Sequence, residues 1–225
     1  MKNETKIVYR VTYTKGDSVK YISHLDFLRC VNRAFKRAKI PVKYSQGFNP
    51  HILLNIGLPC PVGVSSECEM LDIELKEEMD ISSFITRLND AMPSGIRILS
   101  AQRKYNLPDF YDIEYALYDI RLTSSKEFEP QSFSDEECIM IEKKSKRGMK
   151  EVNIKEFIKN VNITHIGNLS YNISAVISAG NKLNLKPELL ISAIAAYYGA
   201  EFKDITTVRK EIYFEQDVTA DTSRA

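Results

Sequence analysis

The sequence predicts an α+β protein made of two successive units of the β–α–β–β–α–β type, with antiparallel sheets and helices packed on one face. Two observations lead to this prediction. Apolar residues alternate with polar ones where strands are expected, and they recur every three or four residues where helices are expected. The first half of the chain also contains these segments in the order strand, helix, strand, strand, helix, strand.

The first half supplies four predicted strands and two predicted helices. Strands are expected where apolar residues alternate, over residues 6–15, 52–58, 67–75 and 96–103. Helices are expected over 24–39, where Leu25, Leu28, Val31, Phe35 and Ala38 form an apolar stripe, and over 80–91. Pro41 and Pro93 end them. This order is that of a split βαβ, ferredoxin-like unit.

The second half contains similar segments with less regular spacing. Strands are predicted over 115–123, 138–144, 168–178 and 207–214. Helices are predicted over 154–161 and 187–198, the latter with Pro187 in the first turn, where proline is tolerated. Residues 143–150 are expected to form the tip of a charged hairpin. We therefore expect a second ferredoxin-like unit.

The domain boundaries follow from these segments. We expect an N-terminal domain over 1–105, a C-terminal domain over 106–215 and a loose polar tail over 216–225. Residues 104–114 have no apolar periodicity and are expected to be a linker.

Composition excludes several classes of protein. The chain has 225 residues, 44% of them hydrophobic, which is enough to form two cores. No apolar run approaches the ~20 residues of a membrane span, and the N-terminus lacks the apolar segment of a signal peptide. We expect a cytoplasmic protein with no membrane partner. Its four cysteines lack CxxC spacing and are expected to be reduced, mostly buried thiols.

Positive charge is concentrated at the start of the chain. Residues 1–51 contain 11 Lys and Arg against 3 Asp and Glu, a net charge of +8, whereas the whole chain carries only +1. A local basic surface of this kind suits an anionic partner, although a solvated helix face is the simpler alternative.

Four basic residues share one face of the first predicted helix. They are Arg29, Arg33, Lys36 and Arg37, at spacings of three and four. The following loop contains the candidate binding residues Tyr44, Ser45, Phe48, Asn49 and His51. Basic groups beside planar rings are typical of sites that hold phosphates and stack on bases. A rigid helix-to-strand connection is the alternative for the loop.

The start of the same helix contains a histidine that a helix cap does not explain. Ser23 and Asp26 fit a capping box. His24 lies in the first turn, beside N–H groups that readily bind anions, so it is a candidate binding residue and a candidate catalytic residue. Ser23, His24 and Asp26 lie too close together on one helical turn to form a nucleophilic triad.

A further candidate binding residue is Arg10, in the first strand. Arg10 and Thr12 are expected to face Asp72 and Glu74 of the third strand on the open face of the sheet. An ion pair at the surface is the alternative explanation for this arrangement.

Several cofactor motifs are absent from the sequence. It contains no CxxxCxxC, no GxxxxGK[ST], no GxGxxG and no HExxH. We therefore expect this chain to bind no metal and no cofactor of its own.

Three segments resemble a bacterial family called the radical SAM-linked protein. They are Tyr21 to Asp26, Arg33 to Pro41 and Tyr44 to Pro50. Later positions fit the same pattern, namely Gly57 to Pro59, Gly63, Ser66, Glu69, Asp72, Lys146 to Ile154 and Arg209, so the resemblance covers nearly the whole chain. Such proteins are fused to, or encoded beside, a radical SAM enzyme with a predicted cobalamin-binding domain. Their genes often neighbour those for a ribonuclease and ribosomal proteins.

The resemblance implies a separate partner enzyme and an RNA-related setting. The partner would carry an iron–sulfur cluster and S-adenosylmethionine, with cobalamin as a candidate third cofactor. The leading hypothesis is thus an accessory module that binds RNA or another phosphate-bearing ligand for this radical SAM enzyme. One alternative is a stand-alone RNA-processing or RNA-modifying enzyme, with His24 as general acid/base and Tyr44 or His51 as its helper. Another is a protein scaffold whose basic face docks the partner.

Overall fold

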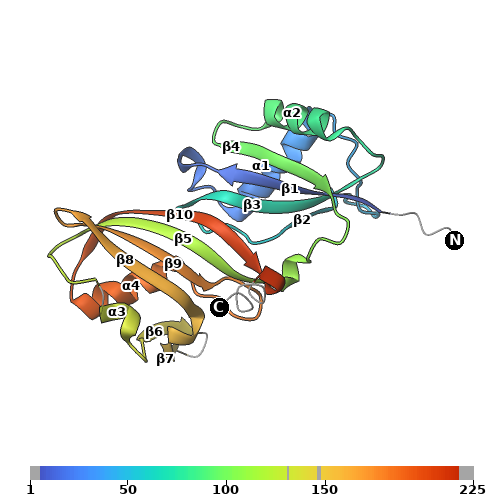
Figure 1. The fold of residues 1–225 in the computed structure, drawn as a ribbon. Helices are drawn as coiled ribbons and strands as arrows, with labels where there is room; N and C mark the ends of the chain where they lie inside the picture. The colour runs from blue at the N-terminus through green and yellow to red at the C-terminus, as the bar shows by residue number, and fades with distance from the viewer. Residues whose placement is uncertain (1–5, 131, 146–147, 218–225) are drawn as a thin grey trace. The chain divides into compact units, whose positions relative to one another are not determined.

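The computed structural model describes residues 6–130, 132–145 and 148–217 (Figure 1). Its contacts divide the chain into two compact units, Met1–Tyr111 (unit 1) and Asp112–Ala225 (unit 2). Both units combine antiparallel strands with few helices, so the predicted α+β class is confirmed.

Unit 1 contains a four-stranded antiparallel sheet. Its strands are β1 (Ile7–Lys15), β2 (Leu54–Ile56), β3 (Val64–Leu75) and β4 (Ile96–Arg103). They lie in the order β4-β1-β3-β2. Strand β1 is central because its apolar residues alternate, which lets one face pack against helices while the backbone pairs on both sides.

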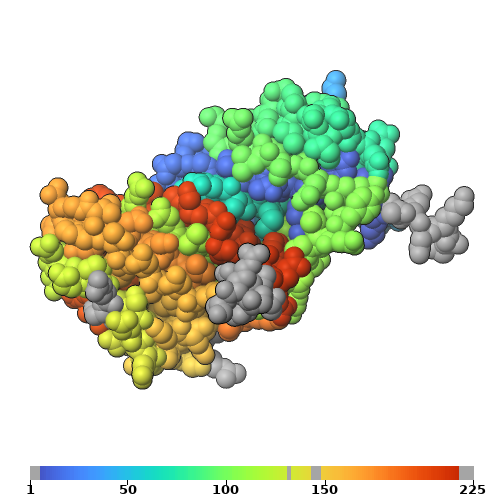
Figure 2. Space-filling view, in the orientation of Figure 1, coloured from blue at the N-terminus to red at the C-terminus, as the bar shows by residue number. Residues whose placement is uncertain are grey.

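Two helices cover one face of this sheet, α1 (His24–Arg37) and α2 (Ile81–Ala91). Phe27 of α1 stacks on Tyr13 of β1 with ring centroids 5.3 Å apart, and Phe84 of α2 meets the edge of Tyr9 at 5.5 Å. In the space-filling view, α2 and β4 form much of the visible surface of unit 1 (Figure 2). The short helix η1 (Asp17–Val19) follows β1.

The two helices also cap each other at their C-terminal ends. Arg87 of α2 donates from Nε and Nη2 to the carbonyl oxygen of Ala38, at 2.9 and 2.6 Å. Arg37 of α1 donates from Nη2 to the carbonyl oxygen of Ala91, at 2.6 Å. Because each guanidinium satisfies carbonyls that a helix end leaves unpaired, the pair fixes the position of α1 relative to α2.

Unit 2 contains a second four-stranded antiparallel sheet. Its strands are β5 (Ile113–Ser124), β8 (Ile158–Gly167), β9 (Ser170–Ser178) and β10 (Phe202–Phe214), in the order β10-β5-β9-β8. Strands β6 (Met140–Ser145) and β7 (Gly148–Asn153) pair separately as a hairpin. The helical segments are η2 (Phe110–Asp112), α3 (Ser132–Asp135), η3 (Lys155–Phe157) and α4 (Pro187–Tyr198).

Unit 2 departs from the sequence prediction in its first helical segment. The helix predicted over 154–161 is wrong, because η3 and then strand β8 occupy this region. Val161 and Ile163 are buried and alternate with exposed Asn162, a period of two that favours a strand. The structure places the short helix α3 and the β6–β7 hairpin after β5, so the predicted ferredoxin-like duplication is not confirmed.

Three smaller expectations are also corrected. Residues 104–110 do not form a loose linker, since Lys104, Pro108 and Phe110 contact Arg10 or Asp72 in unit 1. Leu25 is 63% exposed, so it does not belong to the apolar stripe of α1. The described cysteines are free, but Cys138 is exposed and the other three are half-buried.

Two expectations concern the chain end and membranes. The tail predicted over 216–225 lies outside the described residues from 218 onward, and Asp217 accepts a hydrogen bond from the Phe214 N–H at 2.9 Å. Among the described residues, no helix is both long enough and apolar enough to span a membrane.

Candidate anion-binding site on the first helix

The first turn of α1 is held by the predicted side-chain cap. Ser23 Oγ accepts a hydrogen bond from the Asp26 backbone N–H at 3.2 Å and donates to Asp26 Oδ2 at 2.8 Å. Arg29 Nη1 donates to the other carboxylate oxygen of Asp26 at 2.9 Å. Both members of this ion pair are largely exposed, so water and salt compete with it.

The cap changes the acidity of Asp26. Hydrogen bonds from Ser23 and then Arg29 lower the pKa of the Asp26 carboxyl below its usual value of 3.8. A carboxyl with a lowered pKa in the folded chain stabilises the fold above its unfolded pKa. That contribution is lost as the pH falls through the lowered value.

We predict that Ser23→Ala destabilises the chain and raises the pKa of Asp26 toward its usual value. The loss should be about 1 kcal/mol, since one helical N–H loses its acceptor. Urea denaturation measures the first effect and an NMR titration of the Asp26 carboxyl the second. The matched control is Ser82→Ala, an exposed serine in the first turn of α2 that does not cap that helix. Equal stability of both variants, with the titration of Asp26 unchanged, would contradict the cap.

Three of the four predicted basic residues line one hollow on the exposed face of α1. This arginine hollow has a volume of about 300 Å³ and is lined by Asp26, Arg29, Cys30, Arg33 and Arg37. Lys36 is exposed but does not line it. The arginines are four residues apart, which on a helix places neighbouring side chains ~6 Å apart along the axis. The hollow is therefore a concave surface with a row of positive charges.

The members of the row are not equally free to bind a ligand. Arg37 already holds the end of α2 through its bond to the Ala91 carbonyl oxygen. Arg29 is engaged only by exposed Asp26, and Arg33 is exposed. Burial raises the pKa of the Cys30 thiol, against a smaller lowering by Arg37 and Arg33, so the thiol in this hollow is protonated at neutral pH. Arg29 and Arg33 are consequently the residues best placed to hold an anion.

His24 lies in a different pocket, at the head of α1. This head pocket is lined by Tyr13, Lys15, Ile22, Ser23, His24, Phe27, Ile56, Pro59, Cys60 and Glu69, and its cavity of about 10 Å³ has room for roughly one water. Lys15 is 3% exposed and donates from Nζ to the carbonyl oxygens of Lys20 and Pro61, at 2.9 and 3.2 Å. Glu69 is 1% exposed. The bonds between Ser23 and Asp26 connect this pocket to the arginine hollow.

Sequence reasoning missed Lys15 and Glu69, although a signal was present. Lys15 continues the alternation of Tyr9, Val11 and Tyr13, and Glu69 pairs with Tyr13 across the sheet, so both fall on the helix-covered side. A charged residue at an inward position is unusual and marks either a buried pair or a site. Tyr44 and His51, the expected helpers of His24, do not line its pocket.

The loop after α1 forms a closed structure of its own. Val42 pairs with Leu75 of β3, and Tyr44 forms an isolated bridge with Ile52. The Ser45 N–H donates to the His51 carbonyl oxygen at 2.8 Å. From Gln46 to His51 every residue is exposed. Neither His24 nor the arginine hollow includes a residue of this loop among its lining.

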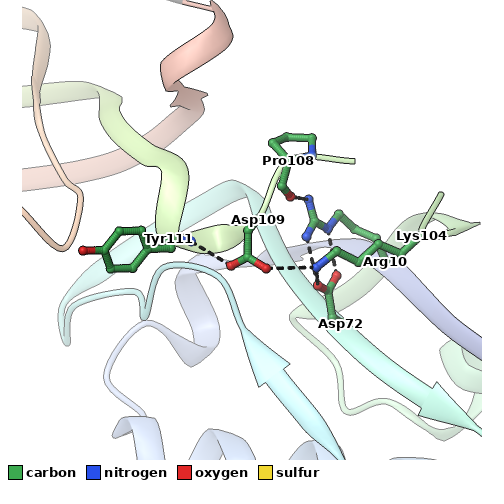
Figure 3. Close-up of polar contacts among 6 residues, drawn as sticks. All are labelled: Arg10, Asp72, Lys104, Pro108, Asp109 and Tyr111. Atoms are coloured by element: carbon green, nitrogen blue, oxygen red, sulfur yellow. Dashed lines mark hydrogen bonds and ion pairs between the residues drawn. The ribbon is translucent and has the colours of Figure 1, made fainter. Parts of the chain in front are cut away.

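Arg10 is engaged inside the protein and does not belong to the candidate site. Figure 3 shows its guanidinium facing Asp72, with Nε 2.7 Å from Oδ1 and Nη2 2.9 Å from Oδ2, and Nη1 donating to the Pro108 carbonyl oxygen at 2.7 Å. Its side chain is 5% exposed and lies over the Phe110 ring, 4.0 Å from the centroid. The expected pairing with Asp72 is thus present, but it is buried and not at the surface.

Lys104 and Asp109 extend this pair toward the surface. Lys104 Nζ donates to Asp72 Oδ2 at 2.9 Å and to Asp109 Oδ2 at 3.4 Å (Figure 3). The Tyr111 backbone N–H is the main cause of a lowered pKa at Asp109, with Lys104 adding to it. Two cations and two carboxylates balance, so this cluster fastens residues 104–111 and presents no excess charge to a ligand.

A metal site finds no support in the side chains that the structure describes. Among residues 6–130, 132–145 and 148–217, no group of three His, Cys, Asp or Glu side chains is placed to hold a metal ion.

Comparisons with known proteins identify a family but no activity. No curated protein matches the sequence. Solved structures do match, among them a crystal structure of an unknown protein from Galdieria sulphuraria. It is 10% identical over 88% of this chain and 97% of that chain, with a TM-score of 0.27, and carries no argument about fold or function. The model of the family described as "Uncharacterized protein conserved in bacteria (DUF2344)" matches residues 8–187, and the chain belongs to this family.

Proposed function

We propose that this protein is a cytoplasmic accessory module that binds RNA through unit 1, with the phosphates held along α1. The observation that carries the proposal is the hollow of about 300 Å³ lined by Arg29, Arg33 and Arg37 on one exposed helix face. Planar guanidinium groups bind phosphate through paired, charge-assisted hydrogen bonds. A row of them on one helix suits a ligand with repeated phosphates better than a single small anion.

The surrounding charge supports the same ligand. Asp26 is the single carboxylate that lines the hollow, and it is occupied by Ser23 and Arg29. The first 51 residues carry a net charge of +8, within a chain that is nearly neutral. A positive surface of this kind also raises the rate at which a polyanion is captured.

The experiment that tests the proposal is RNA binding over a range of salt concentrations. Fluorescence anisotropy with labelled tRNA and ribosomal RNA fragments should give an affinity that falls steeply as salt increases, because bound counterions are released. An affinity that is independent of salt, or the absence of binding at low salt, would contradict the proposal.

A separate radical SAM enzyme is the proposed partner, and this part rests on the sequence resemblance alone. The family description names no partner and no reaction. Purification of the tagged chain from its native cells, followed by mass spectrometry, tests for this enzyme. Recovery of the enzyme without RNA, and no RNA binding by the pure chain, would favour the scaffold alternative, in which an acidic patch of the enzyme occupies the arginine hollow.

We also propose that both units are variants of one ferredoxin-like plan. The first to fourth main strands are β1, β2, β3 and β4 in unit 1, and β5, β8, β9 and β10 in unit 2. In both sheets the fourth strand lies beside the first, then the third, then the second. An experimental structure of the chain tests this relationship.

A second candidate function is RNA turnover by the chain itself, and the head pocket favours it. His24 shares this pocket with two buried ionisable side chains, Lys15 and Glu69, a setting typical of acid–base sites. Under this hypothesis, purified protein cleaves or modifies RNA without added metal, and His24→Ala loses that activity while it retains RNA affinity. Absence of any product after long incubation with varied RNAs would exclude it.

A further inference from the structure

The loop Tyr44–Ile52, here called the Phe48 loop, has a fixed base. His51 donates from its backbone N–H to Ser45 Oγ at 3.0 Å, and the same Oγ lies 2.8 Å from His51 Nδ1. The Ser45 N–H closes the other side by donating to the His51 carbonyl oxygen. Together with the Tyr44–Ile52 bridge, these bonds join the two ends of the loop. The tip therefore projects from a constrained base.

The tip presents one aromatic ring to solvent. Phe48 is 105% exposed, so none of its surface is covered by the rest of the protein. Burying an apolar side chain of this size is worth roughly 1.5–3 kcal/mol, and the folded chain forgoes that gain at Phe48. A ring held out on a closed loop is consistent with a contact that forms only when a ligand binds.

The backbone of the tip depends on a glycine. Gly47 has φ +120°, which L side chains rarely adopt, although a Cβ built there meets nothing within 4 Å. The requirement is thus conformational and not a matter of space. This turn sets the direction in which the chain presents Phe48.

The neighbours of Phe48 indicate which kind of ligand fits. The other tip residues are Gln46, Gly47, Asn49 and Pro50, all exposed, and Phe48 is the single large apolar side chain exposed in this loop. Protein interfaces bury clusters of apolar and aromatic anchors. A single ring between two amides instead matches a nucleobase, whose face stacks on the ring while its edge forms hydrogen bonds.

We propose that the Phe48 loop binds an unpaired base, so that the substrate of this protein is single-stranded RNA. Phe48 stacks on the base, and the Gln46 and Asn49 amides are the candidate partners for its edge. Bases in a duplex are already stacked and paired, and they offer no free face to Phe48. This inference rests on the proposed RNA binding by the arginine hollow, which supplies the phosphate contacts.

The test compares single-stranded RNA with a duplex of the same sequence, by fluorescence anisotropy at several salt concentrations. Wild type is expected to prefer the single strand. Phe48→Ala should weaken single-strand binding about 10-fold, leave duplex binding unchanged and keep the salt slope, because stacking involves no counterion. Phe48→Trp should restore the affinity. The matched control is Ile205→Ala, an exposed apolar residue on β10, which should change neither affinity.

The outcomes separate this inference from the proposed function. Equal binding of duplex and single strand, with Phe48→Ala neutral, overturns the inference and leaves the proposed function in place. No salt-dependent binding by wild type overturns both. If Phe48→Ala instead abolishes recovery of a partner protein from native cells and leaves RNA affinity unchanged, the loop is a protein anchor and the inference is wrong.

Discussion

Asp72→Ala is expected to lower the free energy of unfolding by about 3–5 kcal/mol, the usual cost of leaving a buried charge without its partner. Asp72 accepts hydrogen bonds from both Arg10 and Lys104 (Figure 3). The side chains of Arg10 and Asp72 are 5% and 8% exposed, so water cannot replace the lost carboxylate. Urea denaturation followed by far-ultraviolet circular dichroism measures the loss.

Hydrogen exchange locates this destabilisation. Arg10 lies opposite Asp72 in the register of β1 and β3, so the amides of these two strands should lose protection first. Segment 104–111 should also become accessible to proteases, because Arg10 and Lys104 hold it through Pro108 and Asp109.

Two controls make the prediction specific to the buried pair. Asp26→Ala removes a carboxylate from an exposed ion pair and should change stability little. Arg10→Met combined with Asp72→Leu removes the buried pair while keeping similar volume, and it should be more stable than Asp72→Ala alone. A loss in Asp72→Ala no larger than that in Asp26→Ala would contradict the role assigned to the cluster.

Replacing Arg29 and Arg33 together by alanine is expected to weaken RNA binding about 100-fold at low salt. Each charge-assisted hydrogen bond to phosphate contributes roughly 1.5 kcal/mol, and 1.4 kcal/mol corresponds to a factor of ten. The slope of log affinity against log salt should also decrease by about 1.4, at roughly 0.7 for each phosphate released on a single strand. Arg37 is left intact because it caps α2.

The control variants separate charge from geometry. Arg29→Lys with Arg33→Lys keeps the charges and should retain most of the salt slope, although it loses the paired hydrogen bonds of the guanidinium. Lys36→Ala removes a charge from the same helix outside the hollow and should have a smaller effect. Unchanged affinity in the double alanine variant would show that the RNA, or another ligand, binds elsewhere.

The secondary structure of unit 1 could be predicted from sequence because its signals are local. The alternation of residues 7–13 predicts β1, Ser23 marks the start of α1, and Pro93 follows the end of α2. The same reasoning failed at residues 158–161, where a short stretch with apolar residues fits either period until β9 provides a pairing partner.

The candidate site was only partly predictable for a related reason. Arg29 and Arg33 could be placed on one face of a helix from their spacing alone, and they do line one hollow. The neighbours of His24 could not, since Lys15, Cys60 and Glu69 come from segments that meet only through the pairing of β1 with β3 and the turn before β3. Exposure was also not readable: Phe48 and Phe84 are the same residue type, yet one is fully exposed and the other fully buried.

The sequence by itself determined the order of elements in unit 1, the cap of α1 and the row of basic residues, because helix periodicity and capping act over a few neighbouring residues. Only the tertiary structure decided that Arg10 is buried against Asp72, that residues 104–111 are fastened to unit 1, and that His24 lies apart from the arginine hollow. These features depend on contacts between residues distant in the chain, and burial changes the role of a charged side chain from ligand binding to ion pairing.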